Sequence, residues 1–443
     1  MSKKLFVLSL ALILATVISV AGIRALSNRK SDSVPPLPMQ PLNARATASD
    51  LQIQIAEARI KNFPASPDGY NQLADGYMQK ARETGDFGFN ARAETTLNRS
   101  LEIAPDDSSA LMLRAALLLT YHRFREALEE AKRAQVPGRE SADLYGVMTD
   151  ALVELGDYPA AVEAAQKMMD LRPDSASYSR ASYLRAMHGD LEGAIEAMVV
   201  AVKAANPRNT ENAAWYRVHL GLVLMNAGKR AEGEREFDIA LKTFPDYQPA
   251  LAAKARARVA AGDFDGAIQF YLRAQARVPL PEIIIPLGDL YSKLGRVDEA
   301  KQQYELVDFI ERQAAGNATY SRQLALFWAD HDMKLDEALE IMRQERVARA
   351  DIYTSDALAW CLFKKGRLAE AKESIEQATR LGTRDARILY HAGMIYDGLN
   401  DRQRAVKYLK LALDADFSFD VLQADAAKRK LNELTKKGLT GAS

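Results

Sequence analysis

Apolar residues recur at helical spacing along most of this chain, in paired segments that repeat with a nearly constant period. In residues 280–312, the first apolar face occupies positions i, i+3, i+4 and i+7 of a helix: Ile284, Leu287, Gly288 and Tyr291. Gly295 then predicts a helix end, because glycine adopts a positive φ without strain. A second helix is predicted from the face formed by Ala300, Tyr304 and Val307. Each unit is therefore expected to be a hairpin of two helices.

Ten small residues mark the same position in successive units: Ala93, Ala127, Ala161, Ala194, Gly233, Ala267, Ala300, Ala338, Ala371 and Ala405. After the first unit, a glycine stands five positions earlier in six units: Gly156, Gly189, Gly228, Gly262, Gly295 and Gly366. A larger side chain at the repeated small position would push the two helices apart. A fixed period in this range indicates a repeat array, in which each hairpin buries its remaining apolar surface against its neighbours. The sequence therefore predicts an all-α solenoid.

The order Ile284-x2-Leu287-Gly288-x2-Tyr291, followed by Ala300-x3-Tyr304, resembles the tetratricopeptide repeat. The units Ala142–Ser175, Ala214–Tyr247 and Gln248–Pro281 match its length and its glycine, alanine and proline positions. The resemblance covers residues 67–419 and implies a right-handed α-solenoid of about ten helix hairpins. His122 and Asn400 replace the turn glycine in two units, and the unit of Ala338 has no recognisable turn glycine.

The residues before the array predict a leader and a spacer. An uncharged run, Leu5–Ile23, follows two lysines and spans roughly 28 Å as a helix, close to the thickness of a bilayer core. Residues 1–26 are accordingly predicted to be a signal-anchor or a cleaved signal peptide. The expected location is the cell membrane, single-pass, with the array periplasmic or otherwise extracytoplasmic; secretion after signal cleavage is the alternative.

Residues 27–47 contain four prolines between Pro35 and Pro41, which favours an extended linker over a helix. Residues 48–66 are predicted to form an N-terminal capping helix, from about Ser49 to Asn62. Residues 420–443 are predicted to form a C-terminal capping helix, Asp420 to Leu434, followed by a tail. Both ends of a solenoid need such caps for solubility.

Composition and the absence of known motifs disfavour nucleic-acid binding, catalysis and metal binding. The 443 residues contain 59 basic and 59 acidic side chains, so no global charge favours nucleic acid. The single cysteine, Cys361, excludes an intrachain disulfide. Nucleotide-binding, zinc-protease and serine-hydrolase motifs are absent from the sequence, and the five histidines lie in separate units. We therefore expect a protein that is not an enzyme and has no cofactor and no metal site.

The resemblance implies that the first helix of each hairpin lines a concave groove. The residues that it places there as candidates for partner binding are Tyr183, Trp215, Met225, Trp360, Phe363 and Tyr390. Large aromatic residues on an exposed groove are typical of interface anchors. The alternative for each of them is a place in the core, since aromatic residues at helical spacing are often buried.

The function expected from this pattern is a non-catalytic scaffold, membrane-tethered or exported, that binds a protein or peptide segment in its concave groove. Two alternatives stay open. One is a structural assembly factor that acts through its convex face or its caps. The other is an enzyme with an unrecognised site. The identity of the partner does not follow from the sequence.

Overall fold

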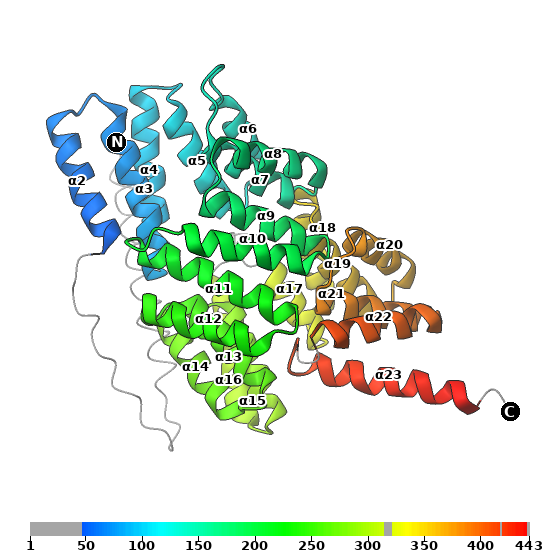
Figure 1. The fold of residues 1–443 in the computed structure, drawn as a ribbon. Coiled ribbons are helices and arrows are strands. Elements are labelled where there is room, and N and C mark those ends of the chain that lie inside the picture. Colours follow the sequence, from blue (N-terminus) through cyan, green and yellow to red (C-terminus); the bar gives the residue numbers. More distant parts are fainter. Residues whose placement is uncertain (1–46, 314–320, 417–418, 441–443) are drawn as a thin grey trace. The chain divides into compact units, whose positions relative to one another are not determined.

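A computed structural model describes residues 47–313, 321–416 and 419–440 (Figure 1), and these ranges are helical with no strand among them. The helices are α2 (Ala48–Asn62), α3 (Pro67–Thr84), α4 (Gly88–Ile103), α5 (Ser108–Thr120), α6 (Phe124–Arg133), α7 (Ala142–Glu154), α8 (Tyr158–Leu171), α9 (Ser175–Met187), α10 (Leu191–Ala204), α11 (Thr210–Asn226), α12 (Arg230–Thr243), α13 (Gln248–Ala260), α14 (Phe264–Arg277), α15 (Pro281–Lys293), α16 (Val297–Gln313), α17 (Ser321–Asp330), α18 (Leu335–Ala348), α19 (Ile352–Lys364), α20 (Leu368–Thr379), α21 (Ala386–Gly398), α22 (Arg402–Ala415) and α23 (Gln423–Thr440).

Ten antiparallel hairpins make up the array, from α3/α4 to α21/α22. Within each hairpin the two helices pack along their length, and each second helix except α16 also packs closely along the first helix of the next hairpin. This confirms the predicted all-α solenoid of about ten helix hairpins. Helix α2 packs on α3 at one end, and α23 packs on α22 at the other.

The repeated small residues all lie on second helices and are all buried, as the pattern predicted. The tightest case joins α11 and α12. A Cβ on Gly233 would lie 2.6 Å from the carbonyl oxygen of Gly221, and a Cβ on Gly221 would lie 2.3 Å from Phe237. No real Cβ fits at those distances, so these two glycines let the helix backbones meet.

The turn inside each hairpin requires one residue in the left-handed region. The six turn glycines named above adopt φ between 72° and 79°. His122 and Asn400 take the same place with φ of 58° and 59°. In the hairpin α17/α18, Asp332 and Lys334 have positive φ instead of a glycine. The turn is thus kept even where the sequence departs from glycine.

The helix at the N-terminal end, α2, starts and stops within one residue of the predicted bounds. Thr47, assigned to the linker, is the N-cap of α2: its backbone N–H donates to Asp50 Oδ2 over 2.9 Å, and its hydroxyl accepts from the Asp50 N–H. Helix α23 begins at Gln423 and runs to Thr440, later at both ends than expected. The predictions for residues 1–26 and 27–46 fall outside the described residues. No helix in the described ranges has the length and apolar content needed to cross a bilayer.

Candidate binding surface

Tyr183, on α9, is the predicted groove residue that faces solvent. Its side chain is 43% exposed. Protein around its hydroxyl nevertheless removes water and raises the pKa of Tyr183 well above its usual range, with Tyr353 and Glu154 adding to the effect. Tyr353 lies on α19 and Glu154 ends α7, so parts of the chain beyond α9 lie near the Tyr183 side chain. Tyr183 therefore has the surroundings that an interface anchor needs.

Trp215, on α11, is half-buried and packs against its own helix. Its ring stacks on His219 with centroids 3.7 Å apart and meets Tyr216 edge-on at 5.1 Å. His219 Nδ1 donates to the Trp215 carbonyl oxygen over 2.9 Å. Burial lowers the pKa of His219, so its imidazole stays neutral near pH 7. Trp215 and His219 are both only partly buried.

Trp360, on α19, is buried, with 3% of its surface exposed. His391 from α21 stacks on it with centroids 4.1 Å apart, and Phe363 stacks at 5.1 Å. The indole Nε1 donates to Asp330 Oδ1 over 2.7 Å. That oxygen also accepts from Gln423 Nε2 at 2.6 Å, so the end of α17 and the start of α23 both close over the ring.

The remaining predicted residues are also covered. Tyr390 is 4% exposed and lies 5.6 Å from the ring of Phe419. Phe363 is partly buried beside Trp360. Met225 is buried because Gly233 leaves room for it between α11 and α12. In these described residues, Trp360, Tyr390 and Met225 are core residues, which was the alternative that the sequence left open.

Helices α17 and α19 contribute charged groups near Tyr183. Arg322 Nη1 lies 3.3 Å from Asp351 Oδ1 and 3.4 Å from Thr354 Oγ1, and its guanidinium lies 5.8 Å from the ring centre of Tyr353. Arg322 and Tyr353 are only partly buried. The surroundings of Tyr183 thus combine an aromatic ring with one arginine that already has an acidic neighbour.

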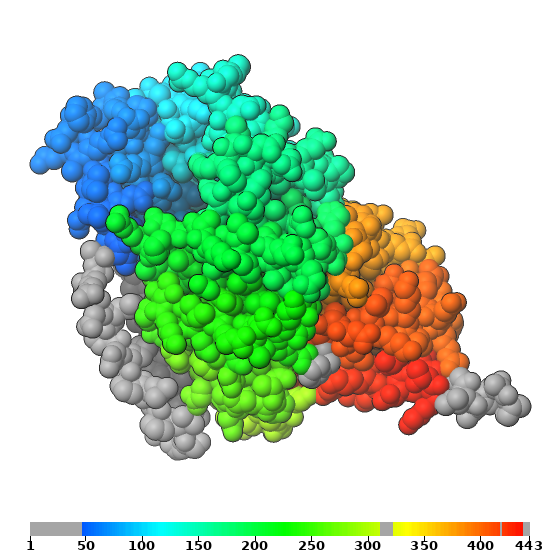
Figure 2. Space-filling model, in the orientation of Figure 1, coloured from blue at the N-terminus to red at the C-terminus, as the bar shows by residue number. Residues whose placement is uncertain are grey.

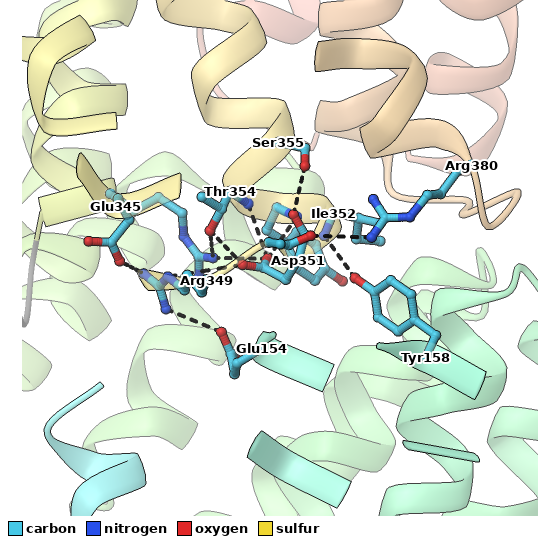
Figure 3. A network of polar contacts seen from close by, with 12 residues as sticks. Glu154, Tyr158, Glu345, Arg349, Asp351, Ile352, Thr354, Ser355 and Arg380 are labelled. Carbon is cyan, nitrogen blue, oxygen red and sulfur yellow. Dashed lines mark hydrogen bonds and ion pairs between the residues drawn. The ribbon is translucent and has the colours of Figure 1, made fainter. Parts of the chain in front are cut away.

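A polar network joins two hairpins that are far apart in the sequence (Figure 3). Arg349, 4% exposed, lies 2.5 Å from Glu345 Oε1, 3.2 Å from Glu154 Oε2 and 4.0 Å from Asp351 Oδ2. Glu154 ends α7, whereas the other three lie on α18 or in the loop before α19. Burial raises the pKa of Glu154, and the Asp351 carboxylate adds to the rise.

Backbone groups take part in the same contact. The Ala350 N–H donates to the Glu154 carbonyl oxygen over 3.0 Å, and the Ile352 N–H donates to the Tyr158 hydroxyl over 2.9 Å. Arg380 donates to the Ala350 carbonyl and lies 4.9 Å from the ring centre of Tyr158. These bonds fix α7/α8 directly to α18/α19, although several hairpins separate them in the sequence. We call the residues Glu154, Tyr158, Glu345, Arg349 and Asp351 the cross-array network.

Sequence reasoning missed the cross-array network because repeats predict contacts between neighbours only. A weak signal was present: Arg349 and Asp351 are charged residues directly before a first helix. Asp351 also caps α19, accepting from the backbone N–H groups of Tyr353 and Thr354.

A second long-range contact ties α3 to α11 and α13. Glu211, 2% exposed, accepts from the Tyr247 hydroxyl at 2.8 Å and from Gln79 Nε2 at 3.1 Å. A Cβ on Gly85 would lie 2.1 Å from Val278, which shows how closely the first hairpin approaches the sixth. The early hairpins are therefore held by later ones as well as by their neighbours.

One buried cluster has a composition seen at active sites. His331 Nε2 lies 2.8 Å from Asp289 Oδ1, and the Tyr304 hydroxyl donates to the same oxygen at 2.8 Å. His331 Nδ1 donates to the Phe327 carbonyl, so both ring nitrogens meet acceptors. Burial lowers the pKa of His331, but the hydrogen bond to Asp289, the charge of that carboxylate and the bond to the Phe327 carbonyl together outweigh burial, and the pKa is raised. The cluster joins α15, α16 and the end of α17 through hydrogen bonds.

Groups with metal-binding or nucleophilic chemistry are not assembled in the described parts of the chain. No three histidine, cysteine or acidic side chains there are placed to hold a metal ion. Burial raises the pKa of Cys361 to about 12, so its sulfur stays a thiol. Two cavities in the described parts of the chain, with volumes of about 360 and 420 Å³, are shallow and polar; the first is lined by the start of α10 and the ends of α11 and α22. The arrangement suits recognition of a surface more than enclosure of a small molecule.

Comparison with known proteins shows tetratricopeptide repeats in this chain. One model of the tetratricopeptide repeat matches residues 148–209 and 218–280, and a second matches residues 283–308, 356–381 and 386–419. Protein FlbA of Caulobacter vibrioides is 27% identical over 149 residues, which are 32% of this chain and 25% of FlbA. The chain thus spans about a quarter of the length of that relative.

Solved structures with similar folds include yeast Tom70, with 15% identity, a TM-score of 0.38, and 88% of this chain and 95% of that chain covered. The match to the APC/C hetero-tetramer Cut9–Hcn1 covers 86% of this chain and 92% of that chain, with 14% identity and a TM-score of 0.33. The match to a tetratricopeptide repeat protein from Parabacteroides merdae covers 59% of this chain and 98% of that chain, with 21% identity and a TM-score of 0.35.

Proposed function

We propose that this chain, which is built from tetratricopeptide repeats, is a non-catalytic scaffold that binds a protein or peptide segment on the concave face of its first helices. The observation that carries the proposal is Tyr183, which stays 43% exposed although most aromatic residues of the first helices are covered. An exposed tyrosine offers a large rigid surface and a hydroxyl at low entropic cost.

The proposal includes a membrane tether or export signal in residues 1–26 and a location outside the cytoplasm. Its support is the uncharged run Leu5–Ile23 after two lysines. Protease added to intact spheroplasts should degrade the array while a cytosolic marker survives. Protection of the array until lysis would reject this location.

The test of the binding surface is site-specific photo-crosslinking in the full chain. A photoreactive phenylalanine analogue at position 183 should crosslink a partner in native membranes. The same analogue at position 347 is the matched control, because Val347 is a highly exposed side chain, 80% accessible, on the second helix α18. Crosslinks at 347 and none at 183 would move the binding surface away from the first helices.

A second candidate is an assembly factor that acts through its N-terminal cap. It is favoured by Leu51 and Ile55, which lie one turn apart on α2 and are 57% and 49% exposed. Apolar neighbours on the end of a solenoid can receive another helix. Replacing both by serine should abolish partner capture under this candidate and leave it unchanged under the first.

A further inference from the structure

The stretch from Phe419 to Asp425 lies against the first helices of three hairpins. Lys293, at the end of α15, donates to the Val421 carbonyl at 3.1 Å and to Asp425 Oδ2 at 2.5 Å. Gln423 Nε2 donates to Asp330 Oδ1, at the end of α17, at 2.6 Å. These contacts join parts of the chain that are far apart in the sequence, so they are separate from the packing of α23 on α22.

Helix α21 supplies the third part of the contact. The ring of Phe419 lies 5.6 Å from that of Tyr390, and Asp420 Oδ2 lies 3.7 Å from Arg387 Nη2. Val421 packs against the apolar cluster of α13 to α16. Every residue of the stretch is partly or fully buried. We call residues 419–425 the C-terminal segment.

The C-terminal segment meets this surface in the way that a bound peptide would. It uses a main-chain carbonyl, an aromatic ring, two carboxylates and an amide, and α23 begins only at Gln423. Asp420 has two roles, because besides its contact with Arg387 its carboxylate accepts from the backbone N–H groups of Leu422 and Gln423 at the start of α23. A capping helix needs only apolar packing on the last hairpin, so these polar contacts to α15, α17 and α21 require another explanation.

The covered surface is the part of the array where the sequence predicted partner anchors. Tyr390 lies under Phe419, and Trp360 shares the Asp330 carboxylate with Gln423. The surface presents two cations, Lys293 and Arg387, with an aromatic ring between first helices. These two cations are complementary to Asp425 and Asp420 of the segment, whereas Asp330 of the same surface accepts a hydrogen bond from Gln423.

We propose that the C-terminal segment occupies, within the chain itself, a binding surface for an acidic, aromatic-containing peptide segment of a partner protein. The inference rests on the proposed scaffold function and names the chemistry of the ligand. A partner carrying an aromatic residue followed by acidic residues displaces residues 419–425. Residues 419–425 compete with the partner for this surface at an effective concentration on the order of millimolar. The apparent affinity of the partner is therefore lower than its affinity for the uncovered surface.

The experiment uses the full chain and a fluorescent peptide with the sequence of residues 419–426. The variant Phe419→Ala/Asp420→Ala/Gln423→Ala should bind this peptide at least about 30-fold more tightly than the wild type, because its own segment no longer competes. Asn432→Ala, on an exposed position of α23, is the matched control and should bind as the wild type does. Adding Arg387→Glu to the triple variant should remove the gain.

Hydrogen exchange on the wild-type chain gives a second readout that needs no variant. Excess peptide should speed amide exchange in residues 419–425, whereas a scrambled peptide should not. Equal peptide affinity of wild type and triple variant, or exchange that excess peptide leaves unchanged, would overturn the inference. Neither result affects crosslinking at position 183, so the scaffold proposal would stand or fall separately.

Discussion

Tyr183 and Trp360 hold the same register in two different hairpins, yet one is exposed and the other is core. Tyr183 stands as far before the repeated small residue Ala194 as Trp360 stands before Ala371. Their exposed fractions are 43% and 3%. Both lie on first helices of the same kind of hairpin. Register within a repeat therefore sets the direction of a side chain and leaves its burial open.

What lies over each ring makes the difference. Trp360 is closed in by His391 from the next hairpin, by Asp330 from the previous one and by Gln423 from the C-terminal end. Tyr183 has α19 near it and a hydroxyl that is desolvated, but its side chain keeps much of its surface open. The last hairpins and α23 form a continuous mass of side chains, orange to red in Figure 2. The rings of the C-terminal hairpins are thus closed in, while α9 keeps an exposed tyrosine.

The largest expected effect is on stability at Trp360. Trp360→Ala removes a buried indole and one of the donors to Asp330, so it should lower the free energy of unfolding by about 3–5 kcal/mol. Tyr183→Ala, at the same register, is the control and should change it by less than about 0.5 kcal/mol. Urea denaturation of both variants measures the two changes in the free energy of unfolding. Equal losses would show that the two positions do not differ as described.

The cross-array network should be nearly as sensitive. Arg349→Ala leaves the buried carboxylates of Glu345 and Asp351 without their shared cation, and removing one partner from such a cluster costs about 3–5 kcal/mol. Arg343→Ala, on the exposed side of α18, should cost almost nothing. An unchanged unfolding midpoint for Arg349→Ala would mean that the network does not hold the distant hairpins together.

The pH dependence of the free energy of unfolding tests the burial of Asp330 beside Trp360. Burial raises the pKa of Asp330 to about 6, against 3.8 for a free side chain. The folded protein therefore holds a proton between those values, and stability falls as pH rises from about 4 to about 6, by at most about 3 kcal/mol. Asp330→Asn keeps the acceptor for Trp360 and should remove this part of the slope. Parallel curves for the two proteins would contradict the raised pKa.

Much of the fold could be predicted because each hairpin carries its own signals. The buried small residue, the turn residue with positive φ and the apolar face all lie within one period, as Gly156 and Ala161 illustrate. The contact of Arg349 with Glu154 could not be predicted, because nothing within one period records how far the array curves. The cover over Trp360 was missed for the same reason, since Gln423 comes from the far end of the chain.

The most direct measurement compares affinity and stability for Tyr183→Ala with a partner captured through position 183. The account predicts that the variant binds about 30-fold more weakly, about 2 kcal/mol, as interface anchors do, while its unfolding curve overlays that of the wild type. Unchanged affinity with an intact fold would contradict the claim that the open inner face of α9 is where this scaffold binds.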